Sequence, residues 1–169
     1  MGKVVIDFLA MFIAVFIASS IADAFLKRCK IKVKLMEGGR MPEFKSEGAV
    51  AMDCYARLQK DLIIMPRMRE TVPLGFAMEL PVRYELQIRP RSGFSKKGFD
   101  VSLGTGDEDY TGEYCATITN NSKERLVIHD GDRICQCAVR EVPRIKLVQV
   151  DVLKETERGD QGFGSTGVN

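Results

Sequence analysis

The chain has 169 residues, 45% of them hydrophobic, with 25 Lys and Arg against 23 Asp and Glu. This length is typical of a single domain with a sizeable core. The near balance of charge excludes a protein held on nucleic acid by its overall field, so we expect no direct nucleic-acid binding and look for local anion sites.

The first element in chain order is an apolar segment at residues 4–26, whose only charged side chains are Asp7 and Asp23. At about 1.5 Å per residue, a helix of this length spans a bilayer core of about 30 Å. A basic run at 27–34 follows, and the more basic flank normally faces the cytoplasm. We therefore expect residues 1–29 to form a hydrophobic helix that anchors a cytoplasmic domain. A cleaved signal peptide and a helix buried in an oligomer are the alternatives.

From residue 30 the hydrophobic period changes to two, which is typical of half-buried strands. Turns rich in glycine and polar residues separate the short runs of this kind. The runs are residues 30–35, 61–65, 72–80, 83–89, 113–119, 125–129, 133–139 and 144–153. Many short strands at regular spacing predict an all-β sandwich or barrel over residues 30–153. The remaining residues, 154–169, are glycine-rich and are expected to form a flexible C-terminal lid.

Cysteine and histidine usage narrows the chemistry. The five cysteines contain no CxxC pair, which argues against a disulfide framework and against a thiolate zinc site. The single histidine, His129, precedes a DGD turn and is expected at the surface. The chemistry must therefore depend on carboxylates and arginines, with or without a metal.

Three glycine-containing segments are candidates for that chemistry. Residues 89–93 (RPRSG) place two arginines and a serine at a tight turn, which suits a phosphate. Residues 104–110 (GTGDEDY) place three acids beside glycines. Residues 158–167 (RGDQGFGSTG) can form a backbone anion nest, but they lack the lysine and the following helix of a Walker loop. Phe163 in this last segment suits stacking on a nucleobase.

Two further segments, AVAMDCYA at 49–56 and GDRICQCAV at 131–139, complete an ordered set of five. From about residue 31 to residue 167 the chain resembles the trimeric dUTP diphosphatase (dUTPase) family, whose five motifs occur in this order. The resemblance implies a jelly-roll-like β barrel and Mg2+-dependent hydrolysis of dUTP to dUMP and pyrophosphate, by attack of water at the α-phosphorus. It also implies a homotrimer in which three chains build each active site.

The resemblance also implies roles for individual residues. Asp107 is the expected general base, and Asp53 is expected to support the magnesium site indirectly. Tyr110 is expected to pack on the deoxyribose. The residues expected in the uracil-reading hairpin are Val101, Gly104 and Gly106. Those expected at the phosphates are Arg91, Ser92, Gly93 and Gln136. Those expected in the closing lid are Arg158, Phe163, Gly164, Ser165 and Thr166.

Gly106 departs from the family pattern, which has a bulky aliphatic residue before the catalytic aspartate. Since glycine has the most backbone freedom to lose, we expect isoleucine at this position to stiffen the hairpin and raise catalytic efficiency. Two other functions stay open. One is a catalytically weakened, nucleotide-binding regulatory protein, and the other is a dCTP deaminase-type relative of the same fold. The DxDY core and the GFGSTG ending argue against the second.

Overall fold

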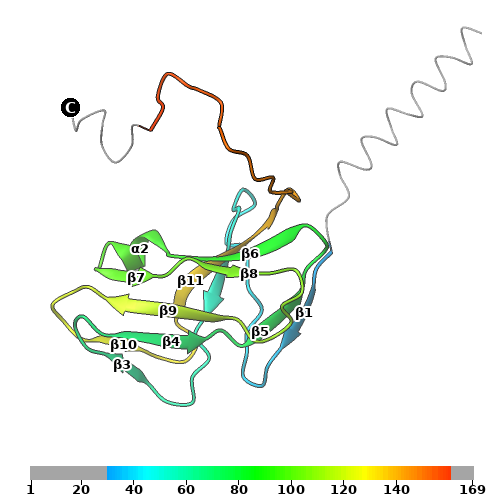
Figure 1. Ribbon diagram of the computed structural model, residues 1–169. Helices are drawn as coiled ribbons and strands as arrows, with labels where there is room; N and C mark the ends of the chain where they lie inside the picture. The colour runs from blue at the N-terminus through cyan, green and yellow to red at the C-terminus, as the bar shows by residue number, and fades with distance from the viewer. Residues whose placement is uncertain (1–29, 161–169) are drawn as a thin grey trace, which may run out of the picture.

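The computed structural model describes residues 30–160 (Figure 1). The expected apolar helix at 1–29 and the lid residues 161–169 lie outside the described residues. Within the described part, no helix is long and apolar enough to cross a bilayer. Strands dominate this part of the chain and the one helix named in it has four residues, so the all-β class expected from the sequence is confirmed.

All strand pairs are antiparallel, and they form four small sheets with the orders β1-β5, β10-β3, β2-β11-β6-β8 and β4-β9-β7. The strands are β1 (Lys32–Leu35), β2 (Met52–Tyr55), β3 (Leu62–Ile64), β4 (Arg69–Pro73), β5 (Phe76–Glu79), β6 (Tyr84–Arg89), β7 (Phe99–Val101), β8 (Gly104–Gly106), β9 (Cys115–Asn120), β10 (Leu126–Ile128) and β11 (Arg133–Glu141). The short helix α2 (Ser92–Ser95) lies between β6 and β7.

The core lies between two layers of strands. In Figure 1, β6 and β8 lie in the upper layer, while β9, β4 and β3 lie in the lower one. Alternate side chains of each strand point inward, as in Leu86 and Ile88 of β6 and Ala116 and Ile118 of β9, all of which are buried. This alternation is the period-two pattern of the sequence.

Two of the expected strands differ in the structure. The run 72–80 is divided between β4 and β5, because the chain turns at Gly75, whose φ of +74° favours glycine. The strand expected at 144–153 is wrong, since this stretch contains no strand and its apolar side chains are exposed. A period-two pattern needs a neighbouring strand to form a ladder, and within residues 30–160 this stretch pairs with none.

Candidate active site

The first of two polar clusters surrounds Asp53, a β2 residue that is only 3% exposed. Its carboxylate oxygens lie 3.3 Å from Nε of Arg91 and 3.1 Å from Nη1 of Arg133. The side-chain amide of Gln136 donates a further hydrogen bond to Oδ1, at 3.0 Å. Arg91 also donates from Nη1 to the carbonyl of Arg133, at 2.7 Å. Two guanidinium groups therefore share one buried carboxylate, which leaves one positive charge for an anion.

A β-bulge explains how Arg133 and Gln136 reach the same carboxylate. Side chains three apart on a regular strand point to opposite faces. In β11 the pairing with β2 shifts between Arg133 and Cys135, so Ile134 is an extra residue and brings Arg133 and Gln136 to one side. The sequence motif predicted Gln136 as a site residue but missed Arg133, because a bulge leaves no clear signal in the hydrophobic pattern.

Ser92 and Gly93, both expected at the phosphates, follow Arg91 directly as the first residues of α2. Both are exposed, so they are accessible at the edge of the Asp53 cluster. Arg91 itself has extended backbone angles and precedes the helix. The structure therefore brings Arg91 and Gln136 together at Asp53, while Ser92 and Gly93 are placed only by following Arg91 in the chain.

The second cluster lines a cavity of about 280 Å³ at the end of β8. The lining residues are Thr105, Asp107, Tyr110, Glu113, Tyr114 and Cys115. Asp107 and Tyr110, both predicted site residues, belong to the loop 107–113, in which the Tyr110 amide donates to the Asp107 carbonyl at 3.1 Å. The Tyr110 hydroxyl donates to the Glu113 carbonyl at 2.9 Å. A carboxylate and an aromatic ring thus face one cavity.

Tyr114, which the sequence did not single out, forms the base of this loop. Its ring packs closely against Gly106. A Cβ atom added to Gly106 would lie only 2.8 Å from the Tyr114 hydroxyl oxygen and 3.0 Å from Cζ. Burial raises the pKa of the Tyr114 hydroxyl, and no hydrogen-bond partner for it lies among residues 30–160. Isoleucine at position 106 would overlap the ring, which argues against the expected stiffening, and we now expect this single substitution to lower catalytic efficiency.

The remaining predicted residues have different positions. Gly104 and Gly106 lie on β8, and Val101 ends β7 with its side chain buried. Arg158 is exposed in the C-terminal stretch. The other lid residues, Phe163, Gly164, Ser165 and Thr166, lie outside the described residues.

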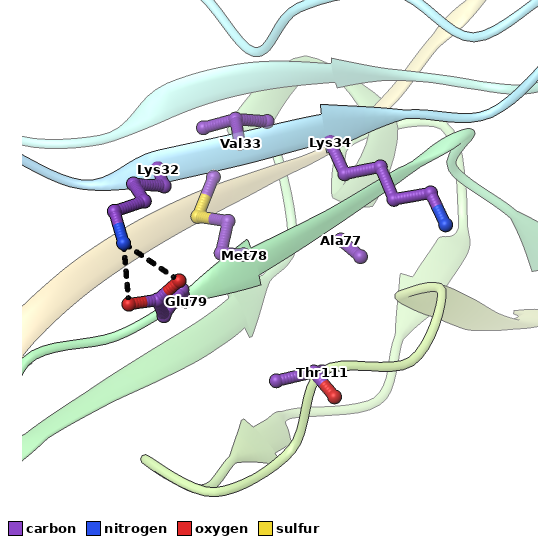
Figure 2. Close-up of a pocket in the computed structure, with 7 residues that line it drawn as sticks. All are labelled: Lys32, Val33, Lys34, Ala77, Met78, Glu79 and Thr111. Carbon is purple, nitrogen blue, oxygen red and sulfur yellow. Dashed lines mark hydrogen bonds and ion pairs between the residues drawn. The ribbon is translucent and has the colours of Figure 1, made fainter.

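A smaller hollow of about 220 Å³ lies between the β1–β5 pair and Thr111 of the loop 107–113 (Figure 2). Thr111 faces it from the loop, and the Lys32–Glu79 ion pair crosses its wall at 2.9 Å. No residue predicted from the sequence lines this hollow. It therefore adds nothing to the two clusters above.

Comparisons with known proteins give one consistent result. A family model described as dUTPase matches residues 37–167. The deoxyuridine 5'-triphosphate nucleotidohydrolase of Caldanaerobacter subterraneus subsp. tengcongensis is 41% identical over 145 residues, which cover 82% of this chain and 97% of that protein. The enzyme of the same name from Finegoldia magna is 39% identical over 141 residues, which cover 82% of this chain and 99% of its own.

Solved structures show the same fold. The dUTPase of Staphylococcus bacteriophage 80alpha with dUPNHPP superposes with a TM-score of 0.73 at 24% identity, covering 83% of this chain and 100% of the phage chain. A mutant dUTPase of phage phi11 of S. aureus, for which coordination of a structural Mg(II) ion is described, has a TM-score of 0.67 at 21% identity and covers 73% of this chain and 98% of its own.

Proposed function

The chain belongs to the dUTPase family and is a dUTP diphosphatase, and we propose that it cleaves dUTP to dUMP and pyrophosphate by attack of water at the α-phosphorus. The observation that carries this mechanism is the cavity that Asp107 and Tyr110 share. Among the described residues, two carboxylates line that cavity, Asp107 and Glu113, and both oxygens of Glu113 already bind Arg57. Asp107 therefore orients the water as general base, and Tyr110 packs on the deoxyribose.

The Asp53 cluster is the proposed phosphate site. Phosphoryl transfer needs positive groups close to the negatively charged non-bridging oxygens, and Arg91 and Arg133 together carry one positive charge more than Asp53 neutralises. Ser92, Gly93 and Gln136 add polar donors around Arg91. The uracil is proposed at the hairpin that contains Val101, Gly104 and Gly106.

A magnesium ion fits this arrangement when it is bound mainly by the phosphates of the substrate. Among residues 30–160, no group of three carboxylate, histidine or cysteine side chains lies close enough to hold a metal together. Mg2+ commonly keeps several waters and binds through substrate phosphates, so Asp53 would hold it indirectly, through water. When bound, the ion neutralises charge on the triphosphate.

The two clusters lie at separate places on one chain. Gln136 pairs with Arg89 of β6, whereas Gly106 pairs with Leu86 of the same strand. Gln136 and Gly106 are therefore offset by three residues along the strand direction and by two strands across the sheet. At the usual spacings of a β-sheet, this offset amounts to roughly 15 Å. Figure 1 likewise places α2 at one end of the molecule and the β8–β9 connection beside β1 at the other. This separation supports a homotrimer in which different chains contribute the two clusters to one site.

The exposed C-terminal stretch supports the same proposal. Residues 145–153 carry six exposed apolar side chains, namely Ile145, Leu147, Val148, Val150, Val152 and Leu153. Exposed apolar side chains that follow one another along a chain mark an interaction surface. We assign this surface to contact with another copy of the chain, which would carry the lid, residues 154–169, to a neighbouring site.

The membrane anchor stays a proposal from the composition of residues 4–26 and their basic flank, with the catalytic domain facing the cytoplasm. Separation of a cell lysate by ultracentrifugation tests it. Full-length protein is expected in the membrane pellet and residues 27–169 in the supernatant. Recovery of both forms in the supernatant without detergent contradicts the anchor.

The proposed reaction is tested by pyrophosphate release from dUTP on residues 27–169 with magnesium. We expect rapid release from dUTP and much slower release from UTP and dCTP. Release without that preference, or binding without release, contradicts the assignment and favours a nucleotide-binding regulator.

A further inference from the structure

The contact between Gly106 and Tyr114 joins the two ends of the loop that carries Asp107. Gly106 is the last residue of β8, and Tyr114 lies immediately before β9. Both residues are buried, and the Tyr114 ring occupies the space that a side chain on Gly106 would need. The two ends of the loop 107–113 are therefore held together by the Tyr114 ring, which packs on the backbone of Gly106.

Tyr114 is held firmly on its own side of this contact. Its amide donates to the Phe76 carbonyl at 2.9 Å, and its carbonyl accepts from the Leu74 amide at 2.9 Å. Its ring centre lies 5.5 Å from that of Phe76 and 5.3 Å from that of Tyr110, the latter in an edge-on arrangement. Both packing partners and both backbone bonds fix the ring, so it is a rigid support.

Strand β8 has much less support of its own. It has three residues, it pairs with β6 alone among the strands of residues 30–160, and it lies at the edge of the four-stranded sheet. Two of its three residues are glycines, which contribute no side chain to the core. The Tyr114 ring therefore supplies packing that the glycine at the end of β8 cannot provide.

We propose that Tyr114 is a positioning residue for Asp107. The ring packs on Gly106, fixes the end of β8, and thereby sets where the next residue, Asp107, directs its carboxylate. This inference rests on the proposed dUTPase mechanism, and it gives the glycine at position 106 a structural reason, since the ring occupies the space that a side chain would need.

The contact predicts a reciprocal pattern of substitutions. Tyr114→Val removes the ring and leaves the end of β8 without a packing partner, while Gly106→Ile drives a side chain into the ring. We expect each single change to lower kcat at least about 10-fold and to change KM less than about 3-fold, because a misplaced catalytic group costs rate rather than binding. In the double variant the side chain at position 106 extends into the space that the tyrosine ring leaves, so the overlap is relieved and we expect kcat within about 5-fold of wild type.

Two further variants separate positioning from loss of stability. Tyr114→Phe keeps the ring and is expected to retain kcat. Ile128→Ala truncates a buried side chain of β10, in a different sheet, and is expected to lower Tm as much as Tyr114→Val without lowering kcat. Gly106→Ala provides a smaller version of the overlap if Gly106→Ile does not fold.

Amide hydrogen exchange gives a readout that does not depend on catalysis. Since the Tyr110 amide donates to the Asp107 carbonyl within the loop, its exchange should become faster in Tyr114→Val than in Ile128→Ala. Wild-type kcat in Tyr114→Val, a double variant as slow as the singles, equal losses in Ile128→Ala, or unchanged Tyr110 exchange would each overturn the proposal. A wild-type chain that does not hydrolyse dUTP would instead refute the proposed function, and the exchange measurement would still test the support.

Discussion

The guanidinium of Arg57 forms two parallel hydrogen bonds with the carboxylate of Glu113, Nε to Oε1 at 2.8 Å and Nη2 to Oε2 at 2.7 Å. Oε1 also accepts a hydrogen bond from the Gly75 amide at 2.9 Å. The two side chains are mostly buried, at 29% and 24% exposed. Since the Glu113 carbonyl accepts from the Tyr110 hydroxyl, this pair ties the loop 107–113 to the segment after β2 and to the β4–β5 turn.

Arg57→Lys is expected to lower the free energy of unfolding by about 1–3 kcal/mol, because lysine cannot make both bonds and leaves a mostly buried carboxylate poorly paired. Urea unfolding measures this change. Lys32→Gln is the matched control, since the Lys32–Glu79 pair is 80% and 62% exposed and its loss should cost less than about 1 kcal/mol. Equal costs for the two variants would show that the Arg57–Glu113 pair gains nothing from its burial.

Glu113 also predicts a pH dependence. The hydrogen bond from Arg57 lowers the pKa of Glu113 from 4.5, with help from the Gly75 amide and against burial, which raises it. A depressed folded-state pKa contributes stability above the unfolded value and loses it as the pH falls through the folded value. The stability difference between wild type and Glu113→Gln should therefore be complete at about pH 7 and shrink below about pH 4.5. A difference that stays constant over this range would contradict the linkage.

His129 predicts a dependence of opposite sign. Its Nδ1 lies 2.8 Å from Oδ1 of Asp61, and this hydrogen bond is the main cause that raises the pKa of His129 above 6.5. The pair contributes stability that is complete below the unfolded pKa and is lost as the pH rises through the folded pKa. Because the chain has one histidine, a proton NMR titration of its imidazole measures the pKa directly. In Asp61→Asn the value should return toward 6.5, and an unchanged midpoint would mean that Asp61 does not stabilise the imidazolium.

The sequence predicted those features that depend on a local pattern. The strands β6 and β9 alternate clearly, and both form where the period indicates. Strand β8 reads as a turn because Gly-Thr-Gly has no side-chain pattern, and only pairing with β6 makes it a strand. Residues 144–153 alternate well but meet no partner strand among the described residues. Pattern therefore indicates which segments can pair, and tertiary contacts decide which do.

The candidate site divides in the same way. Motif order predicted Asp107, Tyr110, Arg91 and Gln136, and the structure groups them into two clusters. Arg133 needed the β11 bulge to face Asp53, and Tyr114 needed the fold to bring it against Gly106. Neither relationship is visible in sequence spacing. The first depends on a β-bulge, and the second on the absence of a side chain at Gly106.

Asp107→Asn is expected to abolish pyrophosphate release while dUTP still binds. The amide keeps the shape of the carboxylate but cannot accept a proton from the attacking water, and loss of a general base costs about 100-fold or more. Asp109→Asn is the matched control, since this acid lies in the same loop but does not line the cavity. Rates from rapid-quench assays and a Kd from calorimetry measure the two effects. Activity of Asp107→Asn within about tenfold of wild type would require a different base.

The last prediction concerns the sharing of sites between chains. If the lid of one chain closes a site on another, a chain truncated after Glu157 should assemble and bind dUTP but turn over very slowly, because nothing excludes water from the cavity around Asp107. Full-length Asp107→Asn chains have a lid but no base. Mixing the two after confirmed subunit exchange should restore activity, since some hybrid sites then combine a lid from one chain with Asp107 from another. Light scattering gives the assembly state, and pyrophosphate release gives the rate. If no mixture regains activity although the subunits exchange, then each chain's lid serves the Asp107 of its own chain, and the separation of the two clusters must be bridged in another way.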